Sequence, residues 1–249
     1  MKQACCLLFF FISVSLFPAK SISFVPGQTL NYKAFYGFLE IGAFTLTTDK
    51  LKYKTMGHVC NKVTLKAQTN GIARLFYMND TWISYLDFAS LETYKSYRHI
   101  QEGKYRLQEI VYFDHKNNKA SVKVKAKNSN GWYFRKQYDT KSPVRDVVAA
   151  FVYATQINYS KIKKGTILKI NGFYPGKDFS IGLKYEGKEM LEKGTIRRMC
   201  YKLHPILPEN KVFDGVDAVE IWISADTKQQ AVFGRAKLFL GNFELEIVD

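Results

Sequence analysis

The sequence has few of the residues that cross-link a fold, break it or bind metal: four cysteines, six prolines and four histidines among 249 residues. It has no collagen-like repeat, heptad array or Gly/Ser-rich linker, and 47% of its residues are hydrophobic, which excludes fibrous and disordered chains. Its one long uncharged, mostly apolar run, residues 4–17, is fourteen residues long. A membrane-spanning helix needs roughly 20 such residues. We therefore expect no transmembrane segment in the mature chain.

Motifs of catalysis and cofactor binding are also lacking. The sequence contains no G-x-S-x-G, no H-E-x-x-H, no P-loop and no G-x-G-x-x-G. The histidines lie far apart in the chain, at His58, His99, His115 and His204. We therefore expect a protein that is not an enzyme, with no catalytic residues, no cofactor and no metal site.

The N-terminus has the pattern of a secretory signal peptide. Lys2 supplies the positive start, residues 4–17 supply the apolar segment, and Ser21 and Ser23 supply the small residues that precede a cleavage site. The pattern predicts removal of residues 1–23, with cleavage nearer Ala19 as the alternative. Residues 24–249 would then be the mature chain, which we expect to form a single β-rich domain.

The charge is strongly positive, at +15 for the whole chain. Removal of Lys2 and Lys20 with the signal peptide leaves +13. A basic protein is attracted to anionic surfaces such as lipid headgroups. Nucleic acid is the other usual partner, but an exported protein rarely meets it. The possible partners are an envelope lipid, a glycan or a protein, and the sequence gives no oligomeric state.

Two cysteines, Cys60 and Cys200, remain after cleavage, and export permits a disulfide between them. Around each of them the odd-numbered positions are apolar and the even-numbered ones mostly polar. Both cysteines therefore fall on the more polar face of a predicted strand. This placement fits a bridge or two accessible thiols better than two inert core cysteines.

Alternation of apolar and polar residues recurs along the chain and predicts antiparallel strands. The architecture expected is mainly β: a curved antiparallel sheet, either a β-sandwich or an open half-barrel. Aromatic residues on its concave face could form an apolar binding groove. The strands are expected near residues 28–37, 41–51, 57–68, 77–86, 90–99, 104–114, 121–127, 131–138, 165–173, 178–185, 219–225 and 243–247.

One main helix is predicted over about residues 143–156. Ser142 is a suitable N-cap, and Pro143 suits the first helical position. The helix face predicted to be buried then consists of Val144, Val147, Val148, Phe151 and Thr155, which recur at helical spacing. Asp146 would lie in the first turn, where the helix dipole favours an acid.

Four segments, at residues 24–32, 36–43, 144–153 and 221–226, together resemble exported bacterial proteins of domain-of-unknown-function family 3108. Residues 24–32 (FVPGQTLNY) are similar to its F-x-P-G-E-x-L-x-Y opening, and residues 36–43 (YGFLEIGA) to its W-G-x-I-x-A-G hairpin. Residues 144–153 (VRDVVAAFVY) resemble its D-x-L-S-A-x-Y-Y helix. Residues 221–226 (IWISAD) match its I-W-L-S-x-D strand. The resemblance implies a mainly antiparallel β protein in the periplasm of a Gram-negative bacterium and brings no established activity.

Three functions remain open. The first is a non-enzymatic protein that binds an apolar or amphiphilic envelope ligand, or a partner protein, on a curved sheet. The second is an enzyme acting on cell wall or glycan, with Asp146 and Asp226 as its acid pair. The third is a structural envelope protein that pairs with a partner along a strand edge. The residues in family-like motifs are Asp146, Trp222, Ser224 and Asp226, and for the two acids we expect structural roles.

Overall fold

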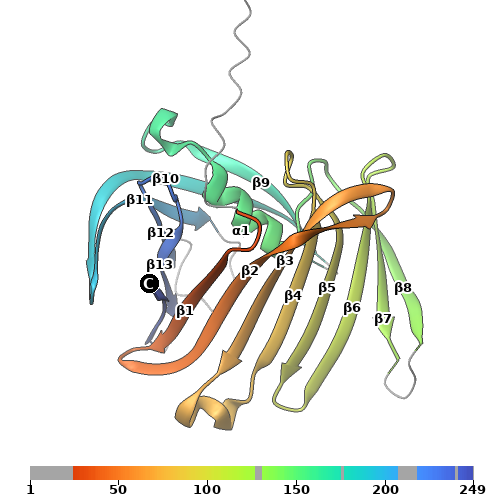
Figure 1. The fold of residues 1–249 in the computed structure, drawn as a ribbon, viewed down its shortest axis with the longest axis horizontal. Helices are drawn as coiled ribbons and strands as arrows, with labels where there is room; N and C mark the ends of the chain where they lie inside the picture. Colours follow the sequence, from red (N-terminus) through yellow and green to blue (C-terminus); the bar gives the residue numbers. More distant parts are fainter. Residues whose placement is uncertain (1–24, 127–130, 175–176, 207–217, 239–240, 249) are drawn as a thin grey trace, which may run out of the picture.

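The computed structural model describes residues 25–126, 131–174, 177–206, 218–238 and 241–248. The predicted signal peptide lies outside these residues. The described chain forms one antiparallel sheet of 14 strands and one α-helix, with two short 3-10 helices, η1 and η2 (Figure 1). The prediction of a mainly β, antiparallel and curved protein is confirmed. There is one sheet, so the half-barrel alternative is correct and the sandwich is not.

The first part of the chain is a run of strands, each paired with the next. It comprises β1 (Thr29–Tyr36), β2 (Leu39–Thr55), β3 (His58–Thr69), η1 (Gly71–Phe76), β4 (Asn79–Leu86), β5 (Thr93–Glu102), β6 (Tyr105–Asp114), β7 (Lys119–Lys125) and β8 (Trp132–Asp139).

The second part begins with the helix and continues as another run of paired strands. It comprises α1 (Val147–Gln156), η2 (Tyr159–Lys161), β9 (Ile167–Tyr174), β10 (Lys177–Lys193), β11 (Ile196–Ile206), β12 (Val219–Ser224), β13 (Ala231–Leu238) and β14 (Gly241–Val248).

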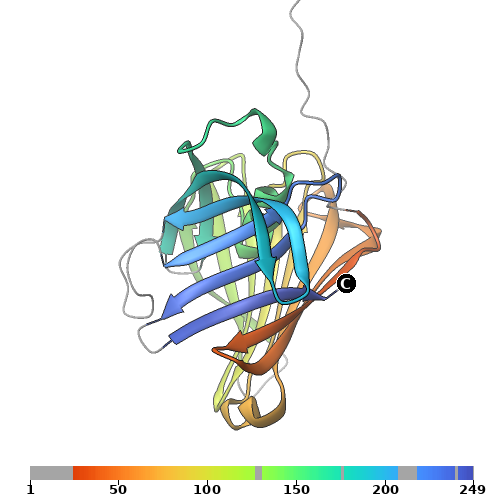
Figure 2. The same cartoon turned by 90° about the vertical axis from the view of Figure 1, so that its left-hand side faces the viewer.

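The two runs are joined in the middle of the sheet by antiparallel pairing of β1 with β14. This leaves β8 at one edge of the sheet and β9 at the other. The sheet curves so that its two halves face each other across α1, and Figures 1 and 2 show this from two directions. The inner face of the sheet is the concave one, toward α1.

The curvature brings strand β9 against the inner face of the other half. The ring of Phe173 on β9 packs edge-on against Phe113 of β6 at 5.4 Å and against Tyr138 of β8 at 5.6 Å between centroids. The guanidinium of Arg98 on β5 lies 4.3 Å from the ring centre of Tyr174. Side chains thus hold the two edges together, although the ladder between β8 and β9 is not formed.

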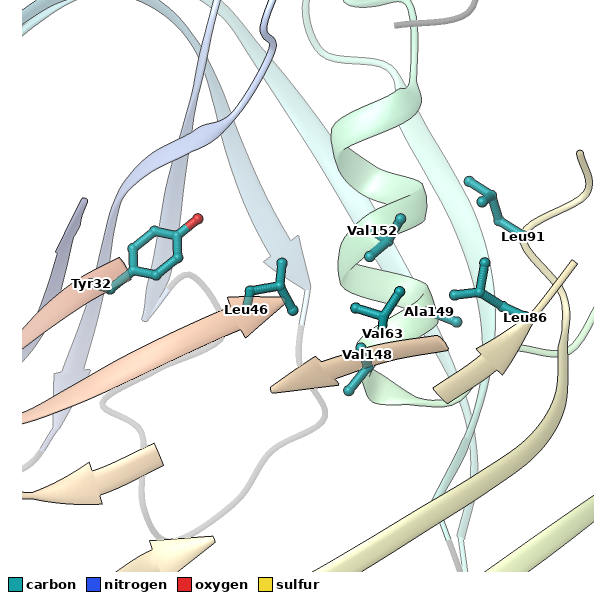
Figure 3. Close-up of a cluster of buried hydrophobic side chains, with 8 residues drawn as sticks. All are labelled: Tyr32, Leu46, Val63, Leu86, Leu91, Val148, Ala149 and Val152. Atoms are coloured by element: carbon teal, nitrogen blue, oxygen red, sulfur yellow. The ribbon is translucent and has the colours of Figure 1, made fainter. Parts of the chain in front are cut away.

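The main core lies on both sides of α1. On one side, Val148, Ala149 and Val152 of the helix pack with residues of β1 to β4, as Figure 3 shows. On the other side, Ala154 packs with Tyr159 and with inward residues of β9 to β13. The helix therefore joins the two halves of the sheet through buried apolar surface, whose removal from water drives folding.

A second apolar cluster lies on the outer face, beneath the far end of the β10–β11 hairpin. Leu191 and Ile196 of that hairpin cover Trp222, Val232 and Phe233. Trp222 alternates along β12 with Ile221 and Ile223, which face inward, so its ring must be covered from outside. The strand predictions missed this arrangement because β13 and the extension of β10 to Lys193 were not expected.

The helix begins later than the sequence predicted. It starts at Val147 with Asp146 as its N-cap, and the Ser142–Pro143 peptide precedes it. Its buried residues are Val148, Ala149, Val152, Ala154 and Thr155, whereas Val147 is 46% exposed. The predicted face was therefore partly wrong. Asp146 is the cap because its carboxylate accepts from the Ala149 amide while its own amide is held by the Thr93 hydroxyl on β5. Among the described residues no helix is long and apolar enough to cross a membrane.

Candidate functional site: an apolar pocket beside helix α1

The inner face of the sheet contains an apolar pocket of about 290 Å³ next to the first turns of α1. Strands β1 to β3 form one wall and strands β12 to β14 the other, so both halves of the sheet contribute. Its volume is close to the lower end of the range of about 300–1,000 Å³ for small-molecule sites. The lining includes Phe44, Leu46, Phe151, Ile221 and Leu245.

Strand alternation explains why this wall is apolar. Phe44 and Leu46 on β2 face the pocket. Thr45, between them, points outward, where its hydroxyl donates to the Asn31 side chain at 3.3 Å. Gly234 on β13 also lines the pocket, and of the described atoms a Cβ added there would have only the Glu220 carbonyl oxygen within 4 Å, at 3.8 Å. The missing side chain at this glycine therefore contributes to the open space.

Tyr32 also lines a second, much smaller cavity of about 20 Å³. The ring rises from β1 with its hydroxyl directed into the space between β1 and α1 (Figure 3). Burial raises the pKa of the Tyr32 phenol well above its ordinary value. The small cavity is lined by Gln28, Leu30, Tyr32, Leu46, Thr48, Phe151, Val152, Thr155, Gln230 and Ala231.

The N-terminus of α1, which borders the pocket, is held by Asp146. Its carboxylate oxygen Oδ1 accepts a hydrogen bond from the Ala149 amide at 2.8 Å. Its own amide donates to the Thr93 hydroxyl on β5 at 3.0 Å, which ties the helix start to the sheet. Burial raises the pKa of Asp146 to about 6, although the Ala149 amide favours the ionised form. Asp146 therefore acts as the cap of a buried helix end.

The C-terminus of α1 is held by the turn between β12 and β13. The Gln229 side chain donates from Nε2 to the carbonyls of Thr155 at 2.8 Å and Ile157 at 2.6 Å. Asp226 organises this turn: its Oδ1 accepts from the Ser224 hydroxyl at 2.8 Å and from two turn amides at 3.0 Å. Burial acts to raise the pKa of Asp226, but these hydrogen bonds outweigh it, so the pKa is lowered.

We expect Gln229→Ala to destabilise the protein by about 1–3 kcal/mol, since it removes two hydrogen bonds to the last turn of α1. Lys228→Ala, in the same turn, is the control and should change stability little. Urea unfolding followed by circular dichroism measures both. Equal stabilities of the two variants would show that the turn does not support the helix.

The acid pair considered for a glycan-acting enzyme does not converge. Asp146 caps one end of α1, and the turn built on Asp226 holds the other end. The helix has 10 residues, which at 1.5 Å per residue is about 15 Å. Glycosidase carboxylates lie roughly 5–10 Å apart. In this structure the two acids have separate, local partners.

Trp222, the remaining residue of the family-like motifs, lies on the outer face of β12. Its side chain is 4% exposed, and its indole Nε1 donates to the Glu189 carboxylate at 2.8 Å. The Lys202 ammonium lies 4.9 Å from the ring centre. The indole thus fixes the β10–β11 hairpin to the sheet rather than facing the pocket.

Both cysteines are free and fully buried, which corrects the expectation of a bridge or of accessible thiols. Cys60 lies on β3 and Cys200 on β11, with five strands between them in the sheet. Burial raises the pKa of each thiol to about 11. The polar alternation around Cys200 was misleading because the β10–β11 hairpin covers the outer face at this point.

A buried ion pair was missed by the sequence analysis. Glu109 on β6 is fully buried, and its Oε1 accepts from Arg98 Nε at 2.6 Å. Arg135 Nη1 is 3.8 Å from the other oxygen. Glu109 lies on the same strand face as Val111 and Phe113. An acid within a row of apolar residues was therefore the sequence signal that could have indicated a buried ion pair. Glu109 and Asp146 also border one small cavity of about 30 Å³, where each has its own partners.

A metal centre has no ligand set in the part of the chain that is described. No group of three or more His, Cys, Asp or Glu side chains there could hold an ion. The histidines have other contacts: the His58 ring stacks on Tyr94 at 4.1 Å, and His115 Nε2 lies 2.8 Å from the Thr93 carbonyl. The apolar pocket is therefore the candidate functional site.

Comparison with known proteins places the chain in a family. No curated protein matches it. A beta-barrel-like protein of domain of unknown function DUF1849 from Brucella abortus has a similar fold, with a TM-score of 0.52 and 8% sequence identity. The alignment covers 89% of this chain and 95% of that one, and at this identity it speaks for the fold alone. The DUF3108 family profile matches residues 31–248. This chain therefore belongs to DUF3108, a family of proteins of unknown function.

Proposed function

We propose that this protein is a non-enzymatic binding protein of the Gram-negative periplasm that holds the apolar chain of an envelope amphiphile beside α1. The observation that carries the proposal is the pocket of about 290 Å³ with its aliphatic and aromatic lining. Protein interiors are normally packed without voids larger than a water molecule. Side chains around an unfilled space lose dispersion contacts, which a hydrocarbon chain would restore.

The location proposed for this activity rests on the sequence. The signal-peptide pattern of residues 1–23 supports export, and the resemblance of the motifs supports a Gram-negative envelope.

Lysines, which contribute to the net positive charge, lie beside tyrosine rings on the outer face of β4 to β7. The Lys95 ammonium lies 5.2 Å from the ring centre of Tyr85 and 5.6 Å from that of Tyr112. Lys123 is 5.6 Å from the Tyr112 ring. Lysines combined with tyrosines suit contact with anionic headgroups at a membrane surface. This face supports delivery or collection of the ligand at a lipid surface.

We expect Gly234→Leu to abolish most binding in the pocket. The new side chain would project from β13 into the space beside Leu245 and Phe44, and the room around the glycine allows it without a backbone clash. The probe is N-phenyl-1-naphthylamine, whose fluorescence rises in apolar surroundings. Its affinity should fall at least about tenfold, equivalent to roughly 1.4 kcal/mol.

Lys237→Leu is the matched control for this experiment. It places the same side chain three residues further along β13, at an exposed position outside the pocket lining. We expect it to bind the probe as the original protein does. Unchanged binding by Gly234→Leu, with the fold intact by circular dichroism, would contradict a ligand site in this pocket.

A second candidate function, pairing with a partner along a strand edge, is supported by β8. Among the described strands it pairs only with β7, and its residues are exposed except at Tyr138. Tyr133 and Phe134 are 54% and 59% exposed. An open, aromatic edge is a template for addition of another strand. Replacing both residues with lysine should then prevent cross-linking to a partner in the periplasm while probe binding in the pocket remains.

A further inference from the structure

The Tyr32 hydroxyl is a buried polar group that the fold does not use. The side chain is 7% exposed, and among the described residues its hydroxyl has no hydrogen-bond partner. Buried polar atoms are nearly always paired, so an unpaired one calls for an explanation. Tyr32 also lines the apolar pocket, which places an unused donor beside the candidate ligand site.

The small cavity beside Tyr32 has room for one oxygen atom. Its volume is about 20 Å³. A cavity of about 10–15 Å³ is enough to hold one water molecule. It shares Tyr32, Leu46, Phe151 and Ala231 with the lining of the large pocket, so the two spaces adjoin. Thr48 and Gln230, both buried, add polar groups to its wall.

We propose that the ligand is a neutral amphiphile with a terminal hydroxyl or carbonyl oxygen. This oxygen enters the small cavity and forms a hydrogen bond with the Tyr32 hydroxyl, while the hydrocarbon chain lies in the apolar pocket. The inference rests on the proposed function and adds the chemical class and the orientation of the ligand: the polar end is innermost.

The charge of the surroundings excludes an ionised headgroup at this position. All ten of the described residues that line the small cavity are uncharged. Burying a carboxylate or phosphate without a cation is strongly unfavourable. A phenol can donate to a carbonyl or hydroxyl oxygen and can accept from a hydroxyl, so it suits a neutral polar group.

The test compares three eight-carbon ligands that differ only at one end: octan-1-ol, octane and octanoate. Each displaces N-phenyl-1-naphthylamine from the original protein and from Tyr32→Phe, which keeps the ring and removes the hydroxyl. We expect Tyr32→Phe to lower the affinity for octan-1-ol about three- to tenfold, because one hydrogen bond is lost. The affinity for octane should not change. In the original protein octan-1-ol should bind more tightly than octanoate.

Three results would overturn the inference. Unchanged octan-1-ol affinity in Tyr32→Phe would mean that the small cavity holds only an ordered water. An equal loss of affinity for octan-1-ol and for octane would mean that the substitution acts through packing of the ring. Tighter binding of octanoate than of octan-1-ol would place the polar end elsewhere. Failure of the proposed function is distinguishable, because octane would then not displace the probe and Gly234→Leu would have no effect.

Discussion

Arg98→Met is expected to destabilise the protein by about 3–5 kcal/mol, the usual cost of leaving a buried charge without its partner. Glu109 is fully buried and receives its short hydrogen bond, 2.6 Å, from Arg98. Arg135 is too far from Glu109, at 3.8 Å, to replace that bond. The Arg98 side chain also covers Tyr174 on β9, so its loss weakens the contact between the two edges of the sheet.

The double variant Arg98→Met/Glu109→Leu separates the two causes. If the uncompensated carboxylate is the main cost, the double variant should recover most of the lost stability, since apolar pairs of similar volume often replace buried ion pairs without loss. Arg197→Met, which removes an arginine that is 80% exposed, is the control and should have little effect. Urea unfolding gives all four free energies. A double variant as unstable as Arg98→Met would assign the loss to packing instead.

Stability should fall as the pH rises from about 4 through 6 because of Asp146. Burial raises its pKa to about 6 in the folded chain, against an ordinary value of 3.8. The folded state therefore holds the proton more tightly than the unfolded state. This difference contributes roughly 3 kcal/mol to the free energy of unfolding. The contribution is fully present below the pKa of the unfolded chain and is lost as the pH rises through the pKa of the folded chain.

Asp146→Asn keeps an oxygen that can accept from the Ala149 amide and removes the titration. We expect the free energy of unfolding of this variant to equal that of the original protein near pH 4 and to exceed it at pH 7. Asp146→Ala should instead lose the cap, at a cost of about 0.5–2 kcal/mol near pH 4. Unfolding free energies at pH 4, 5, 6 and 7 test this. Parallel pH profiles for Asp146→Asn and the original protein would show that Asp146 does not titrate in this range.

The predicted elements of the fold agree best where strand alternation is strict. On β7, Ala120, Val122 and Val124 are buried and alternate with lysines and a serine, and the strand lies two residues earlier than the predicted 121–127. The helix start shows the limit of local patterns. Ser142 and Pro143 are good start signals, yet Asp146 provides the cap, because Thr93 on a distant strand fixes the Asp146 amide.

The candidate site was less predictable than the strands. Aromatic residues on a concave face were expected from the composition, and the pocket has Phe44, Phe151 and Phe243 in its lining. The role of Tyr32 depends on cavities that form between β1, α1 and the loop before β13, which are far apart in the chain. The burial of both cysteines likewise depends on which other elements cover their strands. The alternation of apolar and polar residues along a strand does not predict this.

The sequence by itself determined the mainly β class, most strand positions, the family and one helix, because these follow from local alternation and motif order. Only the tertiary structure decided that β1 pairs with β14, that the sheet curves around α1, and that an apolar pocket remains between its halves. Pairing of strands more than 200 residues apart is selected by the whole packing arrangement. The pocket exists because residues such as Gly234 and Phe44 face the same space, and no local pattern specifies which faces meet.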